Sequence, residues 1–184
     1  MMPTIEQFND IYTKYYLKLS RFAMFYVRND QVAEDIASES MIKLWETMAK
    51  ETVEKPLPLL LTIMKHKSLD YLKQQTSAEA IAENMAEWQQ QELDIRISTL
   101  EACNPDNIFS EEIRAILAKT LQELPPQTRK VFMMSRYEQM SGKEIAEALN
   151  ITVKGVDYIA KALEALRISL KDYLSLFYFL FIQG

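Results

Sequence analysis

Residues 141–152 read Ser-Gly-Lys-Glu-Ile-Ala-Glu-Ala-Leu-Asn-Ile-Thr, and this stretch decides the fold. Ser141 and Glu144 stand three residues apart, as in a capping box, so they predict a short helix over 143–149. Asn150 tolerates the left-handed backbone conformation that ends many helices. The stretch therefore predicts a helix of about two turns with both of its ends marked by local signals.

A second helix is predicted directly after this turn. Thr152 can cap a helix that we expect over about 153–173. Two helices with only three or four residues between them, too few for a strand, indicate a helix-turn-helix. Apolar spacing turns seven side chains toward the core: Ile145, Ala146, Leu149, Val156, Ile159, Ala160 and Leu163. The polar side chains of the second helix then face a DNA major groove or, in an ordinary helical hairpin, solvent.

The composition of the 184-residue chain favours an all-α protein. Hydrophobic residues make up 48%, which is enough for a core, while three glycines leave no Gly-rich phosphate loop and little turn chemistry for a sandwich. The single histidine, His66, and the single cysteine, Cys103, exclude the common zinc sites and an internal disulfide. We predict no metal, no cofactor and no enzyme. One cysteine and no signal peptide favour a cytoplasmic location.

The net charge of −5 is distributed unevenly along the chain. Residues 1–75 hold ten basic and ten acidic side chains, residues 76–110 hold one and seven, and residues 111–184 hold ten and nine. The acidity thus lies in one middle segment, which is how two domains joined by a linker would look. We predict helical domains over 1–75 and 111–175, with an acidic linker over 76–110. Residues 176–184 form an apolar tail, too short to span a bilayer.

Apolar stripes at helical spacing predict three helices within 1–75. The first stripe covers 8–26, and Asp30 can cap the second helix. A third helix is expected over about 59–73, after a loop that contains two prolines. In the last block, Ser110 is a candidate N-cap followed by two glutamates that suit the helix dipole.

Three stretches resemble one family, the extracytoplasmic-function (ECF) sigma factors of bacterial RNA polymerase. Residues 123–167, which begin Glu-Leu-Pro-Pro-Gln-Thr-Arg and include the capping-box stretch, resemble region 4. Residues 33–45, Ala-Glu-Asp-Ile-Ala-Ser-Glu-Ser-Met-Ile-Lys-Leu-Trp, are similar to region 2.2. Residues 63–73, Ile-Met-Lys-His-Lys-Ser-Leu-Asp-Tyr-Leu-Lys, are similar to regions 2.3 and 2.4. The stretches Ser-Arg-Tyr-Glu at 135–138 and Lys-Asp-Tyr-Leu at 171–174 look most like those of Bacteroides-type sigma factors.

The resemblance implies an alternative sigma factor, which binds core RNA polymerase through its clamp and flap and directs transcription from specific promoters. By position, Asp35, Glu39 and Glu46 would contact the polymerase clamp. The same carboxylates also fit a solvated face on which Glu39 pairs with Lys43, four residues further on. A stand-alone helix-turn-helix regulator is the alternative function, and it leaves the region 2.2 similarity unexplained.

The resemblance also implies two sets of promoter contacts. The set for the −10 element consists of Lys50, Lys55, Lys65, His66, Asp70 and Lys73. The set for the −35 element consists of Thr152, Lys154, Gly155, Asp157, Tyr158 and Lys161. The sequence departs from the family at His66, where the family usually has Asn, and at Gly155, where it usually has Thr. An anti-sigma factor is implied as a further partner, and membrane contact would come only through it.

Overall fold

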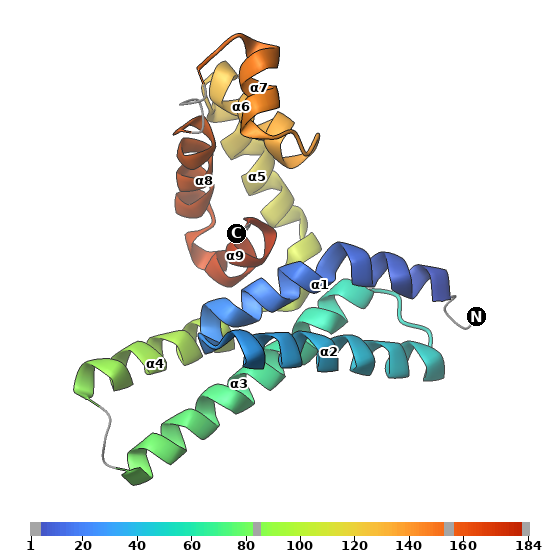
Figure 1. Ribbon diagram of the computed structural model, residues 1–184, viewed down its shortest axis with the longest axis vertical. Helices are drawn as coiled ribbons and strands as arrows, with labels where there is room; N and C mark the ends of the chain where they lie inside the picture. The colour runs from blue at the N-terminus through green and yellow to red at the C-terminus, as the bar shows by residue number, and fades with distance from the viewer. Residues whose placement is uncertain (1–4, 83–85, 153–156, 182–184) are drawn as a thin grey trace. The chain divides into compact units, whose positions relative to one another are not determined.

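The computed structural model describes residues 5–82, 86–152 and 157–181, and these residues form helices without any strand. The all-α prediction is therefore confirmed for the described part of the chain. Two compact units divide it: unit 1 holds Met1–Ile108 together with Tyr178–Gly184, and unit 2 holds Phe109–Phe177. Figure 1 labels the helices by which each unit is described below.

Unit 1 is built on three long helices, α1 (Ile5–Val27), α2 (Asp30–Lys50) and α3 (Pro56–Ala82), which pack against one another. Their apolar stripes meet in a core that includes Leu19, Phe22, Ala23, Tyr26, Ala33, Ile36, Met41, Leu44, Leu60, Met64 and Leu72. Asn29 caps α2, because its side chain accepts a hydrogen bond from the Val32 amide at 3.1 Å. The prediction that Asp30 is the cap was therefore wrong by one residue.

A fourth helix, α4 (Glu87–Glu101), occupies much of the segment that we expected to be a linker. It packs on α3, and both Leu93 and Leu100 are buried. Arg96 donates a hydrogen bond through Nη1 to the Tyr26 carbonyl at 2.7 Å, which fastens α4 to the end of α1. Unit 1 therefore continues through this segment to Ile108, since its few apolar side chains are used for packing.

Unit 2 contains α5 (Glu111–Glu123), α6 (Pro126–Arg136), α7 (Gly142–Leu149) and α8 (Asp157–Ser169), followed by the short 3-10 helix η3 (Lys171–Tyr173). Helix α8 packs on α5 and α6, and α7 packs on α6. The core includes Ile113, Val131, Phe132, Ile145, Ala146, Ala162, Leu166 and Leu170. As predicted, Ser110 caps α5 by accepting from the Ile113 amide at 3.2 Å.

Two details of the predicted second helix of the helix-turn-helix were wrong. Helix α8 ends at Ser169 instead of Tyr173, because Leu170 leaves helical geometry at φ −100° and ψ 26° with its side chain buried. Ala160 is exposed, since Ala162 and Leu166 form the buried face. The expected start of this helix and Val156 lie outside the described residues.

The described part of the apolar tail lies in a final helix, α9 (Leu174–Phe181). The boundary between the units falls within it, after Phe177. Across the described ranges, none of the helices has both the length and the apolar character needed to cross a membrane.

Candidate functional site

The turn of the helix-turn-helix is held by local hydrogen bonds. Ser141 Oγ accepts from the Glu144 amide at 3.3 Å, and the Glu144 carboxylate accepts from the Ser141 amide at 2.7 Å. Hydrogen bonds that the Ser141 backbone and side chain make to the carboxylate lower the pKa of Glu144, because they stabilise its ionised form. At the other end of α7, Asn150 adopts a left-handed conformation with φ 51° and ψ 46°. Both predicted ends of this helix are confirmed.

A small core fixes the two helices of this motif. Val131, Met134 and Ile145 are buried together. Five partly buried side chains pack against them: Met140, Leu149, Ile151, Tyr158 and Ile159. Because residues from α6, α7, the turn and α8 share this cluster, the orientation of α8 is set by packing within unit 2.

The predicted −35 contacts that can be described lie around the first two turns of α8. Thr152, Asp157 and Lys161 are exposed, while Lys154 and Gly155 lie outside the described residues. Tyr158 is half-buried, and the Lys161 ammonium lies 5.8 Å from the centre of its ring, within cation–π range. Part of the tyrosine thus serves packing, and the polar side chains beside it are accessible to a ligand.

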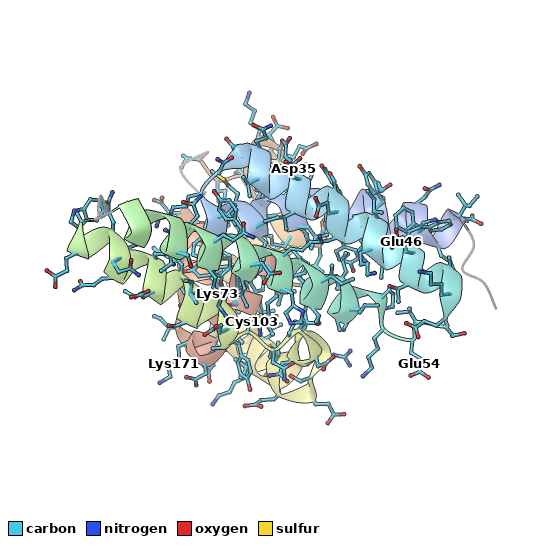
Figure 2. The ribbon with its side chains drawn as sticks, turned by 90° about the horizontal axis from the view of Figure 1, so that it is seen from below. Asp35, Glu46, Glu54, Lys73, Cys103 and Lys171 are labelled. Atoms are coloured by element: carbon cyan, nitrogen blue, oxygen red, sulfur yellow. The ribbon has the colours of Figure 1, made fainter. Side chains whose placement is uncertain are left out.

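The three predicted polymerase contacts are exposed along α2, and Figure 2 labels Asp35 and Glu46. Glu39 forms an ion pair with Lys67 of α3. Lys43 lies 3.8 Å from the Glu46 carboxylate, so the Glu39–Lys43 pair of the alternative interpretation is replaced by two other pairs. The apolar side chain of Ile42 is 58% exposed in the middle of this surface. The α2 face therefore combines acidic groups with an exposed apolar residue.

The predicted −10 set divides into two groups. Lys50, Lys55, His66, Asp70 and Lys73 are exposed. Lys65 instead donates hydrogen bonds to the carbonyls of Glu101, at 2.8 Å, and Cys103, and Lys73 lies 2.7 Å from the Glu101 carboxylate. Figure 2 labels Lys73 and Cys103. These two lysines hold the carboxyl end of α4, which has a favourable dipole for cations. The sequence offered no local signal for this role, because the Lys65 partners are 36 and 38 residues away.

His66, which belongs to the predicted −10 set, also lies beside the predicted polymerase contacts of α2. It lines one hollow together with Glu39, Lys43 and Glu46 of α2. The family resemblance assigned His66 to the promoter, and the structure places it beside the acidic surface of α2.

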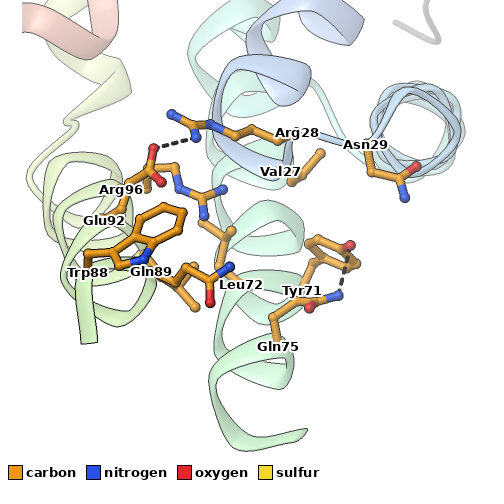
Figure 3. Close-up of a pocket in the computed structure, with 11 residues that line it drawn as sticks. Val27, Arg28, Asn29, Tyr71, Leu72, Gln75, Trp88, Gln89, Glu92 and Arg96 are labelled. Carbon is orange, nitrogen blue, oxygen red and sulfur yellow. Dashed lines mark hydrogen bonds and ion pairs between the residues drawn. The ribbon is translucent and has the colours of Figure 1, made fainter. Parts of the chain in front are cut away.

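Sequence reasoning missed a pocket of about 280 Å³ where the end of α1 meets α3 and α4 (Figure 3). Its lining includes Trp88, which is 65% exposed, and Arg28, which pairs with Glu92. Arg28 has φ 54°, a conformation that is uncommon outside glycine. The lining comes from three helices, so no single stretch of sequence marked it.

A helix-turn-helix with an accessible polar second helix is the geometry of a class of DNA-binding proteins. Residues 11–78 match Sigma-70 region 2, and residues 114–166 match Sigma-70, region 4. The chain belongs to the sigma-70 family. The first match lies within unit 1 and the second within unit 2.

Two curated relatives agree with this assignment. The chain is 26% identical over 134 residues to the Ferric citrate uptake sigma factor FecI of Escherichia coli, which covers 72% of each protein. It is 22% identical over 144 residues to a Probable RNA polymerase sigma factor of Haemophilus influenzae, covering 71% of the chain and 72% of the relative. The chain is thus an alternative sigma factor of the ECF type. It binds core RNA polymerase, directs transcription from promoter DNA and is not an enzyme. Its Bacteroides type remains a prediction.

Proposed function

We propose that the two units divide promoter recognition between them. Unit 1 docks on the polymerase clamp through α2 and opens the −10 element, while unit 2 reads the −35 element with α8 and touches the flap. The single observation that carries this proposal is the exposed polar surface of α8, fixed by the packing of the helix-turn-helix. A helix presented in this way fits the major groove.

The charge of the helix-turn-helix supports dependence on a partner. On α8, Lys161 and Arg167 are balanced by Asp157 and Glu164, and Arg167 lies 2.8 Å from the Glu164 carboxylate. Few cations are left to neutralise phosphates, so unaided binding to duplex DNA should be weak near physiological salt. Docking on the polymerase would supply the missing affinity by raising the local concentration of the second site.

Run-off transcription with bacterial core polymerase and a genomic DNA pool tests the −35 role. Reversing the charge at Lys154 and Lys161 (Lys154→Glu with Lys161→Glu) should abolish specific transcripts while polymerase binding persists, because like charges would face the phosphates. The control is Lys130→Glu, one reversal of the same kind at an exposed site on α6, and it is compared with the single variant Lys161→Glu. Unchanged promoter use by the double variant would remove the −35 assignment.

The α2 face is tested separately. Asp35→Arg with Glu39→Arg should weaken assembly with core polymerase, since two carboxylates that face a basic clamp would become cationic. Glu34→Arg introduces one such charge reversal at another exposed position of α2, and its effect is compared with that of each single variant, Asp35→Arg and Glu39→Arg. Normal assembly of the double variant in a sedimentation or native-gel assay would remove the clamp assignment.

The −10 role falls on the members of the predicted set that are not bound to the end of α4. Lys50, Lys55, His66 and Asp70 are accessible as they stand, whereas Lys65 and Lys73 would first have to leave the end of α4. His66 can donate a hydrogen bond to a base or stack on it. Permanganate footprinting of melted promoter DNA should show weaker opening with His66→Ala than with the wild type, and equal opening would make His66 a plain surface residue.

A stand-alone regulator is the competing function, and it predicts the opposite behaviour without polymerase. Tight, sequence-specific binding of duplex DNA by the purified chain at about 0.15 M salt would favour it. The proposed sigma factor works in the cytoplasm with the polymerase. An anti-sigma factor that covers α2 and α8 would compete with both the polymerase and the promoter, and titration of such a protein into the holoenzyme should release the chain.

A further inference from the structure

The carboxyl end of α4 lies against two lysines of α3 that belong to the predicted −10 set. The Lys73 ammonium is 2.7 Å from the Glu101 carboxylate. Lys65 donates hydrogen bonds to the backbone carbonyls of Glu101, at 2.8 Å, and of Cys103. All four residues belong to unit 1. Lys73 therefore already has an anionic partner within its own unit, and a DNA phosphate would have to compete with that partner.

The two lysines are held to different degrees. The side chains of Lys73 and Glu101 are 57% and 49% exposed, and ion pairs as accessible as this one are weak because water and salt screen them. Lys65 is half-buried and binds two carbonyls at the end of a helix, where the helix dipole favours a cation. Lys73 can thus change its partner at little cost, while Lys65 keeps the end of α4 in place.

Helix α4 stays on unit 1 without the Lys73 ion pair. Leu93 and Leu100 are buried, and Arg96 donates a hydrogen bond to the Tyr26 carbonyl at 2.7 Å. None of these contacts uses the Glu101 carboxylate. The carboxylate is therefore held beside α3 whether or not it binds a lysine, and it can take Lys73 back whenever a competing anion leaves.

A phosphate and the Glu101 carboxylate cannot share Lys73 without repulsion. A phosphate oxygen bound to the Lys73 ammonium would lie about 2.8 Å from it, and the carboxylate lies 2.7 Å from the same nitrogen. The two anions would then be well within the screening distance of about 8 Å at physiological salt. Their repulsion favours an exchange of one partner for the other.

We propose that Glu101 is an intramolecular competitor of promoter phosphates for Lys73. In the free protein its carboxylate holds the lysine, and on the melted −10 element a phosphate takes its place while Lys65 keeps Glu101 nearby. The proposal rests on the proposed −10 role of Lys73. Its consequence is a threshold, because DNA that brings no phosphate to this point does not release the lysine.

Promoter opening by the holoenzyme tests the competition. Permanganate reactivity is measured against holoenzyme concentration, on a promoter recovered by run-off transcription. Glu101→Gln removes the charge and keeps the size of the side chain, so the concentration for half-maximal opening should fall about threefold, the range expected for an exposed ion pair. The control Glu87→Gln removes the same charge from an exposed site in the first turn of α4 and should change nothing.

A double-mutant cycle with Lys73→Met ties the effect to the lysine. If Glu101 acts by holding Lys73, Glu101→Gln should improve opening in the wild type and have no effect in the Lys73→Met background. An equal improvement in both backgrounds would overturn the competition and assign the effect to the general charge of α4. Hydrogen exchange of the α4 amides verifies that the helix stays docked in each variant.

The same cycle separates the competition from the proposed function. If Lys73→Met impairs opening while Glu101→Gln leaves it unchanged, the −10 role of Lys73 stands and the competition is overturned. If Lys73→Met has no effect even in the Glu101→Gln background, Lys73 is not a promoter contact and both fail. A wild-type chain that forms no promoter complex with core polymerase would overturn the proposed function, and the competition with it.

Discussion

The two units use their polar side chains in different ways. In unit 1 the informative contacts join residues far apart in sequence: 28 residues for Lys67 and Glu39, 36 for Lys65 and Glu101, and 70 for Arg96 and Tyr26. In unit 2 the capping box that opens α7 joins residues only three apart. The difference teaches that local signals specify the DNA-reading motif, while long-range polar contacts specify how α4 is held in unit 1.

The same difference separates the cations available to DNA from those used for structure. Lys65 and Lys73 of unit 1 bind the end of α4, while Lys50 and Lys55 stay exposed. Residue type and position on a helix could not distinguish these two pairs. What distinguishes Lys65 and Lys73 is their partners, Glu101 and Cys103. These partners lie in the segment that composition alone marked as a linker.

The largest expected effect tests whether α4 is a packed helix. Leu100 is fully buried, so Leu100→Ala should lower the free energy of unfolding by about 2–5 kcal/mol through lost burial and a residual cavity. Urea denaturation followed by circular dichroism measures the change. The control is Ile95→Ala on the same helix, where the side chain is 65% exposed and a change within about 0.5 kcal/mol is expected. If the two substitutions had equal effects on stability, α4 would not be a packed helix and the segment would be a loose linker.

The next effect concerns the lysine that holds the end of α4. Lys65→Met should cost about 1.5 kcal/mol, the lower end of the range for hydrogen bonds from a charged donor, because two carbonyls lose their partner. The same denaturation assay applies. Lys50→Met, at an exposed site of the neighbouring helix, should change stability by less than about 0.5 kcal/mol. If Lys65→Met behaved like Lys50→Met and impaired promoter opening instead, the lysine would belong to the DNA set.

The predictable part of the fold was the part with local signals. Ser110, the Ser141 and Glu144 box and the left-handed Asn150 were all found from spacing and residue type. The cap of α2 was missed by one residue, since Asn29 and Asp30 are equally good caps and only the backbone path chooses between them. Helix α4 was missed as a packed element because its apolar pattern is sparse, and its attachment depends on Arg96 and on lysines of α3.

The candidate site divides in the same way. The family resemblance named the two regions, and the family matches confirmed them. The sequence could not show that His66 shares a hollow with the acidic face of α2 or that Tyr178 and Phe179 dock on α1. Each of these contacts depends on tertiary packing between segments that are far apart in the sequence.

A smaller effect is expected from the local contacts of unit 2. Ser141→Ala removes the side-chain cap of α7 and should destabilise unit 2 by about 1 kcal/mol, the usual cost of losing a serine N-cap. Hydrogen exchange of the α7 amides measures the loss where it occurs. Ser169→Ala, at the exposed last residue of α8, should leave the same amides unchanged. Loss of protection throughout unit 1 as well would contradict a purely local role for this cap.

The smallest effect is a pH dependence from the other half of the capping box. The pKa of Glu144 is lowered in the folded chain by its hydrogen bonds with Ser141, so its ionised form binds more strongly there than in the unfolded chain. Its contribution is therefore fully present above the ordinary value of 4.5 and is lost as the pH falls through the lower folded value. Carbon NMR of the carboxyl group should show a midpoint below 4.5.

Glu144→Gln separates the charge from the hydrogen bond. Glutamine can still accept from the Ser141 amide but does not titrate, so protection of the α7 amides should fall less between pH 5 and pH 3 than in the wild type. Glu147→Gln removes the same charge from another exposed site of α7 and should keep the wild-type pH dependence. If both variants lost the pH dependence equally, general charge repulsion on α7 would be responsible for it. The Ser141–Glu144 contact would then no longer support the contrast between local contacts in unit 2 and long-range contacts in unit 1.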